Sequence, residues 1–258
     1  MLVPLLVSMA IAQSTSATGG CDRLDAADLT ALERRAALDA CATAVHEQPI
    51  DYLIERVSLL APHDPRTEIY GDLAANWSPT ELAQSAVSTK LLAIFNGAGT
   101  NGSARVVALR ALAAIPADQR PAEVRAIDQV TIEINALPSQ MSYDKKNFSV
   151  SPGCLVHLIL HNPDALEHNL LIVAPGALAE MGIAGDRMGQ TPDGKAKEFV
   201  PPSPKVLTVM GLVAPGKSKS LWFVAPMKAA TYPYVCTYPS HWRTMNGKMK
   251  VVAPESNP

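Results

Sequence analysis

The spacing of hydrophobic residues changes part-way along the chain, from helical spacing to strand-like alternation. In the first part, the run Ser-Pro-Thr-Glu from Ser78 to Glu81 is a capping box with proline at the first helical position, and apolar residues follow it. Helices are also expected over residues 27–45 and 104–115, where helix-forming residues predominate. These patterns predict a small helical domain over residues 22–120.

The second part has the alternation that is typical of strands. Over residues 156–161 an aliphatic side chain occupies every second position, while His157 and His161 share one face. A metal site built on these two histidines is conceivable, but we interpret their face as the solvated surface of the strand. Further strands are expected at residues 130–134, 169–173, 205–209, 219–224, 232–236 and 248–252. Short strands in this number favour an all-β sandwich or barrel over residues 125–254.

One insertion interrupts the strands. Residues 176–187 have helical character, and the segment 192–204 that follows is rich in proline and charge. We expect this insertion to cover one flank of the β domain rather than to form a domain of its own.

The composition is typical of a globular protein with one or two cores. The chain has 258 residues, of which 48% are hydrophobic and 18% are charged, and its formal net charge is -2. Lysine and arginine are dispersed, so nucleic acid is not expected as a partner. No apolar stretch reaches the roughly 18 to 20 residues that a membrane span needs.

Residues 1–20 resemble a secretory signal peptide, with an apolar segment over residues 2–12 that ends in Ala-Ile-Ala. No basic residue precedes this segment, which departs from the usual pattern. Because the apolar segment and its ending still fit a signal peptide, we predict export to the periplasm or the extracellular space. Lipidation at Cys21 is an alternative, although the preceding residues lack the aliphatic side chain expected at such a site.

Three cysteines are available for structural roles. A disulfide between Cys21 and Cys41 is feasible in an oxidising compartment, but their spacing alone does not establish it. Cys154 lies in a Ser-Pro-Gly-Cys turn and is interpreted as a buried, unpaired thiol.

The fourth cysteine belongs to a pattern that suits a metal. Cys236, His241 and Met245 stand in a Cys-x4-His-x3-Met spacing between two predicted strands. A thiolate, an imidazole and a weak thioether, together with one more histidine, form the ligand set of a trigonal copper site with a long axial bond. His168, where a polar turn runs into an apolar strand, is the best candidate for that further ligand.

Residues 125–254 resemble a cupredoxin of the azurin, plastocyanin and auracyanin family, and azurin most closely. Three stretches in the same order carry the resemblance: the strand and turn at residues 148–153, the pair His168-Asn169, and the loop from Cys236 to Met245. The resemblance implies a Greek-key sandwich that binds one type 1 copper ion, preceded here by the α-helical domain.

The resemblance also implies a role for each matching residue. His168, Cys236 and His241 become equatorial ligands and Met245 the axial one, while Asn169 and Thr237 surround them and the backbone carbonyl of Glu167 offers a weak contact. Two positions depart from the pattern, since the family usually has glycine where this chain has Ser240, and azurin has glycine where it has Glu167.

The function implied is single-electron transfer by Cu(II)/Cu(I) cycling, not enzymatic catalysis. Redox proteins are expected to dock near His241, where Tyr238, Pro239 and Trp242 either line an apolar patch or pack into the core. The alternative is a copper storage, delivery or sensor protein whose helical domain binds a partner. Copper enzymes are disfavoured because the His-x-His pairs that they need do not occur in the chain.

Overall fold

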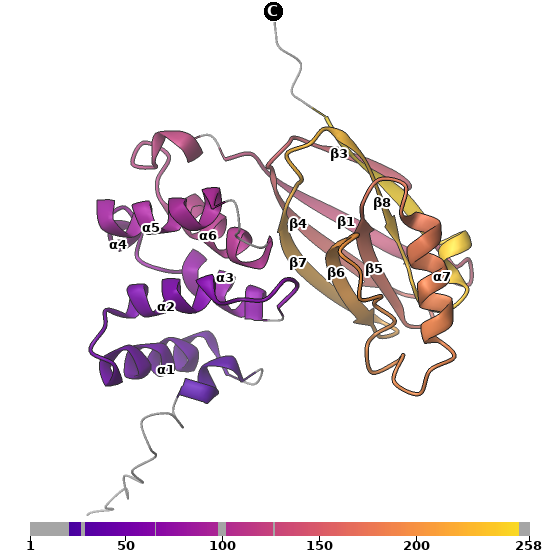
Figure 1. Cartoon of the computed structure of the whole chain (residues 1–258), viewed down its shortest axis with the longest axis horizontal. Coiled ribbons are helices and arrows are strands. Elements are labelled where there is room, and N and C mark those ends of the chain that lie inside the picture. The colour runs from indigo at the N-terminus through magenta and orange to yellow at the C-terminus, as the bar shows by residue number, and fades with distance from the viewer. Residues whose placement is uncertain (1–20, 27–28, 65, 98–101, 126, 253–258) are drawn as a thin grey trace, which may run out of the picture. The chain divides into compact units, whose positions relative to one another are not determined.

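The computed structural model describes residues 21–252, apart from residues 27–28, 65, 98–101 and 126 (Figure 1). The chain divides into two compact units, residues 1–55 and residues 56–258. The limits of 22–120 and 125–254 for the two domains stay a prediction. The proposed leader, residues 1–20, lies outside the described residues.

The first unit contains a short 3-10 helix η1 (Cys21–Asp25), the helix α1 (Ala31–Ala44) and most of α2 (Pro49–Ser58). The helix expected at residues 27–45 begins at Ala31, because Thr30 and Glu33 form a capping box. Cys21 and Cys41 form a disulfide, with their Cα atoms 5.6 Å apart, which settles the pairing that the sequence left open.

The second unit begins with the helices α3 (Arg66–Ala75), α4 (Pro79–Leu82), α5 (Ser85–Asn96), α6 (Gly102–Ala114) and the 3-10 helix η2 (Ala122–Val124), which precede its strands. The apolar residues after Ser78 suggested a single helix, but the helix ends at Leu82 and a second one begins at Ser85, with Gln84 at its N-cap position and no side-chain cap. Helix α6, expected at residues 104–115, is almost wholly buried. Its Arg110 pairs with Asp72 of α3 at 2.5 Å, so a buried cation has a carboxylate partner.

Two β-sheets pack face to face and confirm the predicted sandwich (Figure 1). One sheet has the strand order β2-β1-β4-β7, formed by Ser142–Tyr143, Gln129–Leu137, Leu155–Asn162 and Lys217–Val224. The other has the order β3-β9-β8-β5-β6, formed by Asn147–Val150, Asn246–Val251, Ala230–Val235, His168–Val173 and Val206–Val213. The pairs β1 with β4 and β3 with β9 are parallel, while the other pairs are antiparallel.

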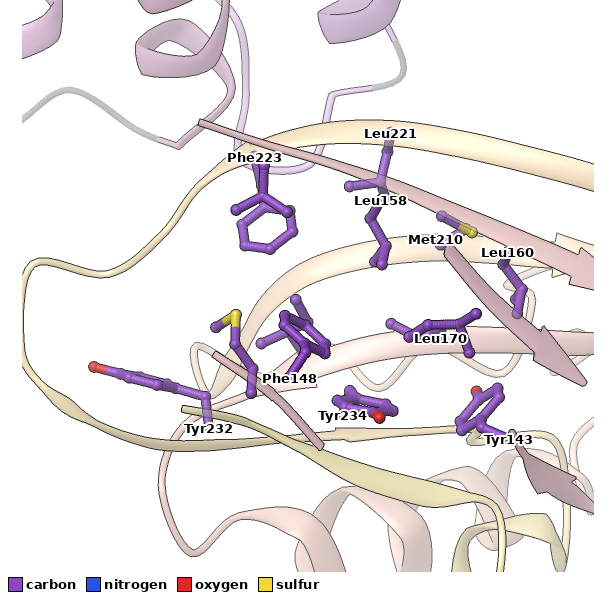
Figure 2. Close-up of a cluster of buried hydrophobic side chains, with 14 of the residues drawn as sticks. Tyr143, Phe148, Leu158, Leu160, Leu170, Met210, Leu221, Phe223, Tyr232 and Tyr234 are labelled. Atoms are coloured by element: carbon purple, nitrogen blue, oxygen red, sulfur yellow. The ribbon is translucent and has the colours of Figure 1, made fainter. Parts of the chain in front are cut away.

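The core lies between these sheets and draws side chains from both (Figure 2). Its large buried side chains include Tyr143, Phe148, Leu158, Leu160, Leu170, Met210, Leu221, Phe223, Tyr232 and Tyr234. Cys154 is buried with a free thiol, as the sequence predicted. Burial of this apolar surface is the main force that holds the two sheets together.

The aliphatic core residues and the histidines of β4 lie on opposite faces of the strand, as the alternation predicted. Val156, Leu158 and Leu160 point into the core, whereas His157 and His161 are half-buried on the opposite face. The ring of His157 stacks on that of Trp222 at 4.3 Å, and His161 Nδ1 lies 2.7 Å from Ser218 Oγ. Each histidine therefore has a partner of its own.

The predicted helical insertion is α7 (Leu178–Met188), which covers the outer face of the second sheet (Figure 1). Between helix and sheet lies a small apolar cluster of Leu171, Val173, Ala177, Met181, Val206 and Val235, with Trp242 packed against it. Strand β5 is thus buried on both faces. In the part of the chain that the structure describes, no helix has the length and hydropathy to cross a bilayer.

Candidate metal centre

The four predicted ligands come from one end of the second sheet. His168 is the first residue of β5, Cys236 follows β8 directly, His241 begins the 3-10 helix η3 (His241–Arg243), and Met245 precedes β9. Their exposed fractions are 0% for His168, Cys236 and Met245 and 3% for His241. Strand ends and the helix η3 therefore carry the donors into a site from which water is largely excluded.

Three donor atoms face one another. Nδ1 of His168 lies 3.2 Å from Nδ1 of His241, and Sγ of Cys236 lies 4.0 Å from the first nitrogen and 3.7 Å from the second. A metal bonded to nitrogen at about 2 Å and to sulfur at about 2.3 Å needs donors roughly 3 to 4 Å apart. These three residues are the group with metal-binding geometry among the described histidine, cysteine and acidic residues.

Met245 is fixed beside the other donors by the backbone. Its carbonyl accepts a hydrogen bond of 3.0 Å from the N–H of Cys236, and its own N–H donates to the carbonyl of His241 at 2.9 Å. One thiolate, two imidazoles and one thioether are the donor types of a type 1 copper site. The residues present therefore fit copper.

Ser240, one of the two departures from the family pattern, has a backbone φ of 73°. This left-handed conformation is the one that glycine adopts without strain, which explains the usual glycine at this position. The N–H of Ser240 donates to Oδ1 of Asp186 at 2.6 Å, so a contact from α7 holds the unusual conformation.

Asn169 and Thr237 join β5 to the ligand loop. The N–H of Thr237 donates to Oδ1 of Asn169 at 2.8 Å, and Nδ2 of Asn169 donates to Oγ1 of Thr237 at 2.9 Å. The hydroxyl of Tyr143 donates to the Asn169 carbonyl at 2.6 Å. All these groups are buried, so the loop that carries Cys236 is bonded to the strand that carries His168.

Sequence reasoning missed Asp186, which lies on α7 and holds the ligand loop. Besides Ser240, it accepts a hydrogen bond of 2.9 Å from Nε1 of Trp242 and pairs with Arg243 at 3.3 Å. Helix α7 comes this close because glycines face the loop: a Cβ on Gly185 would lie 2.4 Å from the Thr237 carbonyl oxygen.

Sequence reasoning also missed Asp164, in the turn between β4 and β5. Oδ2 of its buried carboxylate lies 2.9 Å from Nε2 of His168. The N–H of Ser139, followed by the His168 ring and the N–H of Ala165, lowers the pKa of Asp164 against the opposing effect of burial. Neither aspartate belongs to a recognisable motif: Asp186 meets the ligand loop through tertiary folding, and Asp164, although only four residues before His168, meets its ring through the conformation of the turn.

The electrostatics suit a metal that binds neutral histidine and displaces a thiol proton. Burial raises the pKa of Cys236 to about 12, against smaller opposing effects of hydrogen bonds with Asn169 and Tyr238. Burial, and then the charge of His168, lower the pKa of His241 to about 4. At neutral pH the metal-free site therefore holds a thiol and a neutral His241 imidazole, and metal binding must release the thiol proton.

The aromatic residues beside His241 pack inward. Tyr238 is half-buried, with its ring 4.7 Å from that of His241 and 5.0 Å from that of Phe199. Trp242 packs against the cluster beneath α7. Both rings are thus half-buried against neighbouring side chains, and their part in a docking patch stays a prediction. The side chain of Glu167 pairs with Lys195 at 2.7 Å, and the role of its carbonyl stays a prediction.

Comparison with known proteins agrees with this geometry. Residues 130–252 match the model of a family described as copper binding proteins, plastocyanin/azurin family. Auracyanin-A of Chloroflexus aurantiacus is 32% identical over 124 residues, which are 47% of this chain and 74% of that protein. The chain belongs to this family. Membership confirms the predicted fold and the predicted copper cofactor. It also confirms that the chain is an electron-carrying cupredoxin, not an enzyme.

One further relative and one solved structure are also similar to this cupredoxin. Azurin-2 of Alcaligenes xylosoxydans xylosoxydans is 28% identical over 132 residues, which are 48% of this chain and 96% of that protein. The solved structure of auracyanin A from Chloroflexus aurantiacus, described as a "blue" copper protein, is 30% identical. The match covers 48% of this chain and 99% of that one, with a TM-score of 0.44.

Proposed function

We propose that this cupredoxin binds one copper ion through His168, Cys236 and His241, with Met245 as the axial ligand, and carries single electrons between redox proteins. The observation that carries this proposal is the meeting of three buried donor atoms, from two strand ends and the 3-10 helix η3, all within 4.8 Å of one another. Bound copper supplies a one-electron couple between Cu(II) and Cu(I).

The residues around the ligands keep them in place. The paired hydrogen bonds of Asn169 and Thr237 fix β5 against the ligand loop, and Asp186 fixes the far end of that loop. Ligands held by contacts that do not depend on the metal move little when its charge changes, and low rearrangement favours fast electron transfer. We assign Asn169 and Thr237 this supporting role and the Glu167 carbonyl a weak axial contact.

The burial of the site favours electron transfer over copper storage or delivery. A delivery protein must release its metal, whereas here all four donors are at most 3% exposed. Exchange would require the ligand loop to separate from both β5 and α7. An electron, in contrast, passes through the ring of His241 without any opening of the site.

We place the docking surface for redox partners around His241. Two large apolar side chains, Met141 and Leu166, are each 45% exposed close to the ligands. The carbonyl of Met141 accepts a hydrogen bond of 2.9 Å from Oγ1 of Thr244, just after η3, and Leu166 lies in the turn that leads to His168. A small apolar surface suits the weak, brief contacts of redox partners.

We also propose that the protein is exported to the periplasm or the extracellular space. The disulfide between Cys21 and Cys41 supports this, because such bonds form and persist in oxidising compartments. The resemblance of residues 1–20 to a signal peptide points in the same direction.

Replacement of the thiolate ligand tests the proposal. Cys236→Ser should remove the thiolate-to-copper charge transfer and with it the blue colour, while the fold is kept. Cys154→Ser is the matched control, since Cys154 is the other described cysteine with a buried free thiol. Visible spectra of both copper-loaded variants decide the matter: a Cys236→Ser protein that stays blue would refute the ligand assignment.

A further inference from the structure

Asp164 contacts the side of the His168 ring that faces away from the other donor atoms. His168 presents Nδ1 to the other donor atoms, with His241 Nδ1 at 3.2 Å, and presents Nε2 to Oδ2 of Asp164 at 2.9 Å. The exposed fractions of the two side chains are 0% for His168 and 5% for Asp164. A carboxylate thus contacts the outer nitrogen of a proposed copper ligand in a site shielded from water.

The carboxylate is held rigidly in this position. Its other oxygen, Oδ1, accepts hydrogen bonds from the N–H of Ser139 at 3.1 Å and from the N–H of Ala165 at 2.7 Å. The turn itself is closed by Asn162, whose Oδ1 accepts from the N–H of Asp164 at 3.1 Å and whose Nδ2 donates to the Val213 carbonyl at 2.8 Å. Asp164 therefore has its orientation fixed by the backbone of the β1–β2 turn and by its own turn.

We propose that Asp164 is a positioning residue that keeps the His168 proton on Nε2, so that Nδ1 is free to bind copper, and that its charge favours Cu(II). The inference rests on the proposed copper site and adds a residue to it. A carboxylate can only accept at Nε2, and a histidine whose Nε2 donates must leave Nδ1 unprotonated when it is neutral. Carboxylates in this position raise the basicity of a metal-binding histidine.

An asparagine at this position would reverse the polarity of the contact. Its oxygen would go on accepting from Ser139 and Ala165, which would turn its amide nitrogen toward His168. Nε2 would then face a donor, and the proton of the neutral ring would move to Nδ1, the nitrogen that copper needs. The size of the side chain hardly changes, so Asp164→Asn separates the chemistry of the contact from its packing.

The first measurement uses the metal-free wild-type protein. Two-bond proton–nitrogen correlation spectra of the labelled protein at neutral pH show which ring nitrogen carries the proton, and comparison with His168→Gln assigns the signals of His168. We expect a proton on Nε2. A His168 ring with its proton on Nδ1 would overturn the inference, and this result does not depend on how any Asp164 variant folds.

The second measurement compares copper-loaded Asp164→Asn with Asp72→Asn. The control removes an equal charge from helix α3, where Asp72 pairs with Arg110. In Asp164→Asn we expect copper to bind about 10- to 100-fold more weakly, and the midpoint potential to rise, because Cu(II) loses a nearby negative charge. A copper dissociation constant and a potential equal to those of the control would overturn the inference.

These outcomes are distinct from failure of the proposed function. A wild-type protein that gives the type 1 copper spectrum but carries the His168 proton on Nδ1 would refute the role of Asp164 alone. A wild-type protein that gives no such spectrum would refute the copper site itself.

Discussion

Ser240 departs from the family pattern of glycine at this position, yet its backbone adopts the conformation that favours glycine. Its φ of 73° lies in the region where a side chain other than that of glycine costs roughly 1 kcal/mol or more. The hydrogen bond of 2.6 Å from its N–H to Asp186 is one interaction that stabilises this turn. The proposed ligand that follows, His241, therefore reaches the site although the usual glycine is missing.

The four proposed ligands could be selected from sequence because the types of residue and their spacing carry the information. Cys236, His241 and Met245 lie in one short loop, and only His168 had to be found at a distance. Asp164 and Asp186 could not be found in this way. Aspartates are common in turns and helices, and only the folded chain shows that one meets the His168 ring and the other meets Trp242.

A residue-scale prediction concerns the axial ligand. Met245→Leu should leave a blue site with a raised midpoint potential, because a weak donor that favours Cu(II) is lost while the three equatorial ligands remain. Met249→Leu is the matched control, since Met249 is also fully buried in the same core but is not a proposed ligand. Voltammetry of both proteins measures the effect, and an unchanged potential in Met245→Leu would show that Met245 does not coordinate copper.

At the scale of elements, helix α7 does more than cover the sheet. The sequence predicted its existence from helical character at residues 176–187 and its place on a flank, and the structure confirms both. Its direct contact with the ligand loop was not predictable. In the sequence, Gly182, Gly185 and Gly189 indicate only residues that destabilise a helix, and not what packs against them. In the fold they allow close approach, with Gly182 against Trp242 and Gly189 against Pro239.

An element-scale prediction follows from the contacts of Asp186 on α7. Asp186→Ala removes hydrogen bonds from the Ser240 N–H and the Trp242 indole, so the free energy of unfolding should fall by about 1 to 3 kcal/mol. Release of copper to a chelator should also become faster. The control is Glu180→Gln, whose exposed pair with Lys205 should contribute less than about 1 kcal/mol. Equal release rates in the two variants would show that α7 does not hold the loop.

The helical part illustrates where sequence patterns fall short. The capping motif at Ser78 correctly marked a helix start, and the N–H of Glu81 does donate to the Ser78 hydroxyl at 3.4 Å. The helix nevertheless stops at Leu82 and restarts at Ser85. Apolar spacing alone does not distinguish one helix from two short ones, since both place their apolar faces on the same core.

For the whole molecule, stability of the metal-free protein should depend on pH through His241. Its pKa of about 4 in the fold lies below the ordinary value of 6.5, so the unfolded chain takes up a proton first as the pH falls. The free energy of unfolding should therefore decrease between pH 6.5 and pH 4, by as much as about 3 kcal/mol from this residue.

Denaturant titrations of the metal-free wild type and His241→Gln at several pH values test this dependence. The difference in stability between the two proteins should shrink or change sign as the pH falls through this window. A difference that stays constant from pH 7 to pH 4 would contradict the lowered pKa of His241.

The two-sheet sandwich was predictable because alternation in strands such as β4 is strong, whereas the positions of its parallel pairs were not. The pairing of β3 with β9 joins segments about 100 residues apart, so no local pattern reports it. This pairing matters for function, because β9 follows Met245 directly and anchors one end of the ligand loop in the sheet.

The central claim is that the chain holds one type 1 copper ion that exchanges single electrons. The most direct test loads the full-length protein with Cu(II) and records its visible absorption and electron paramagnetic resonance spectra before and after a mild reductant and reoxidation. We predict an intense blue band and narrow copper hyperfine splitting that disappear on reduction and return on oxidation. A colourless protein, or the signal of ordinary square-planar copper, would contradict the account.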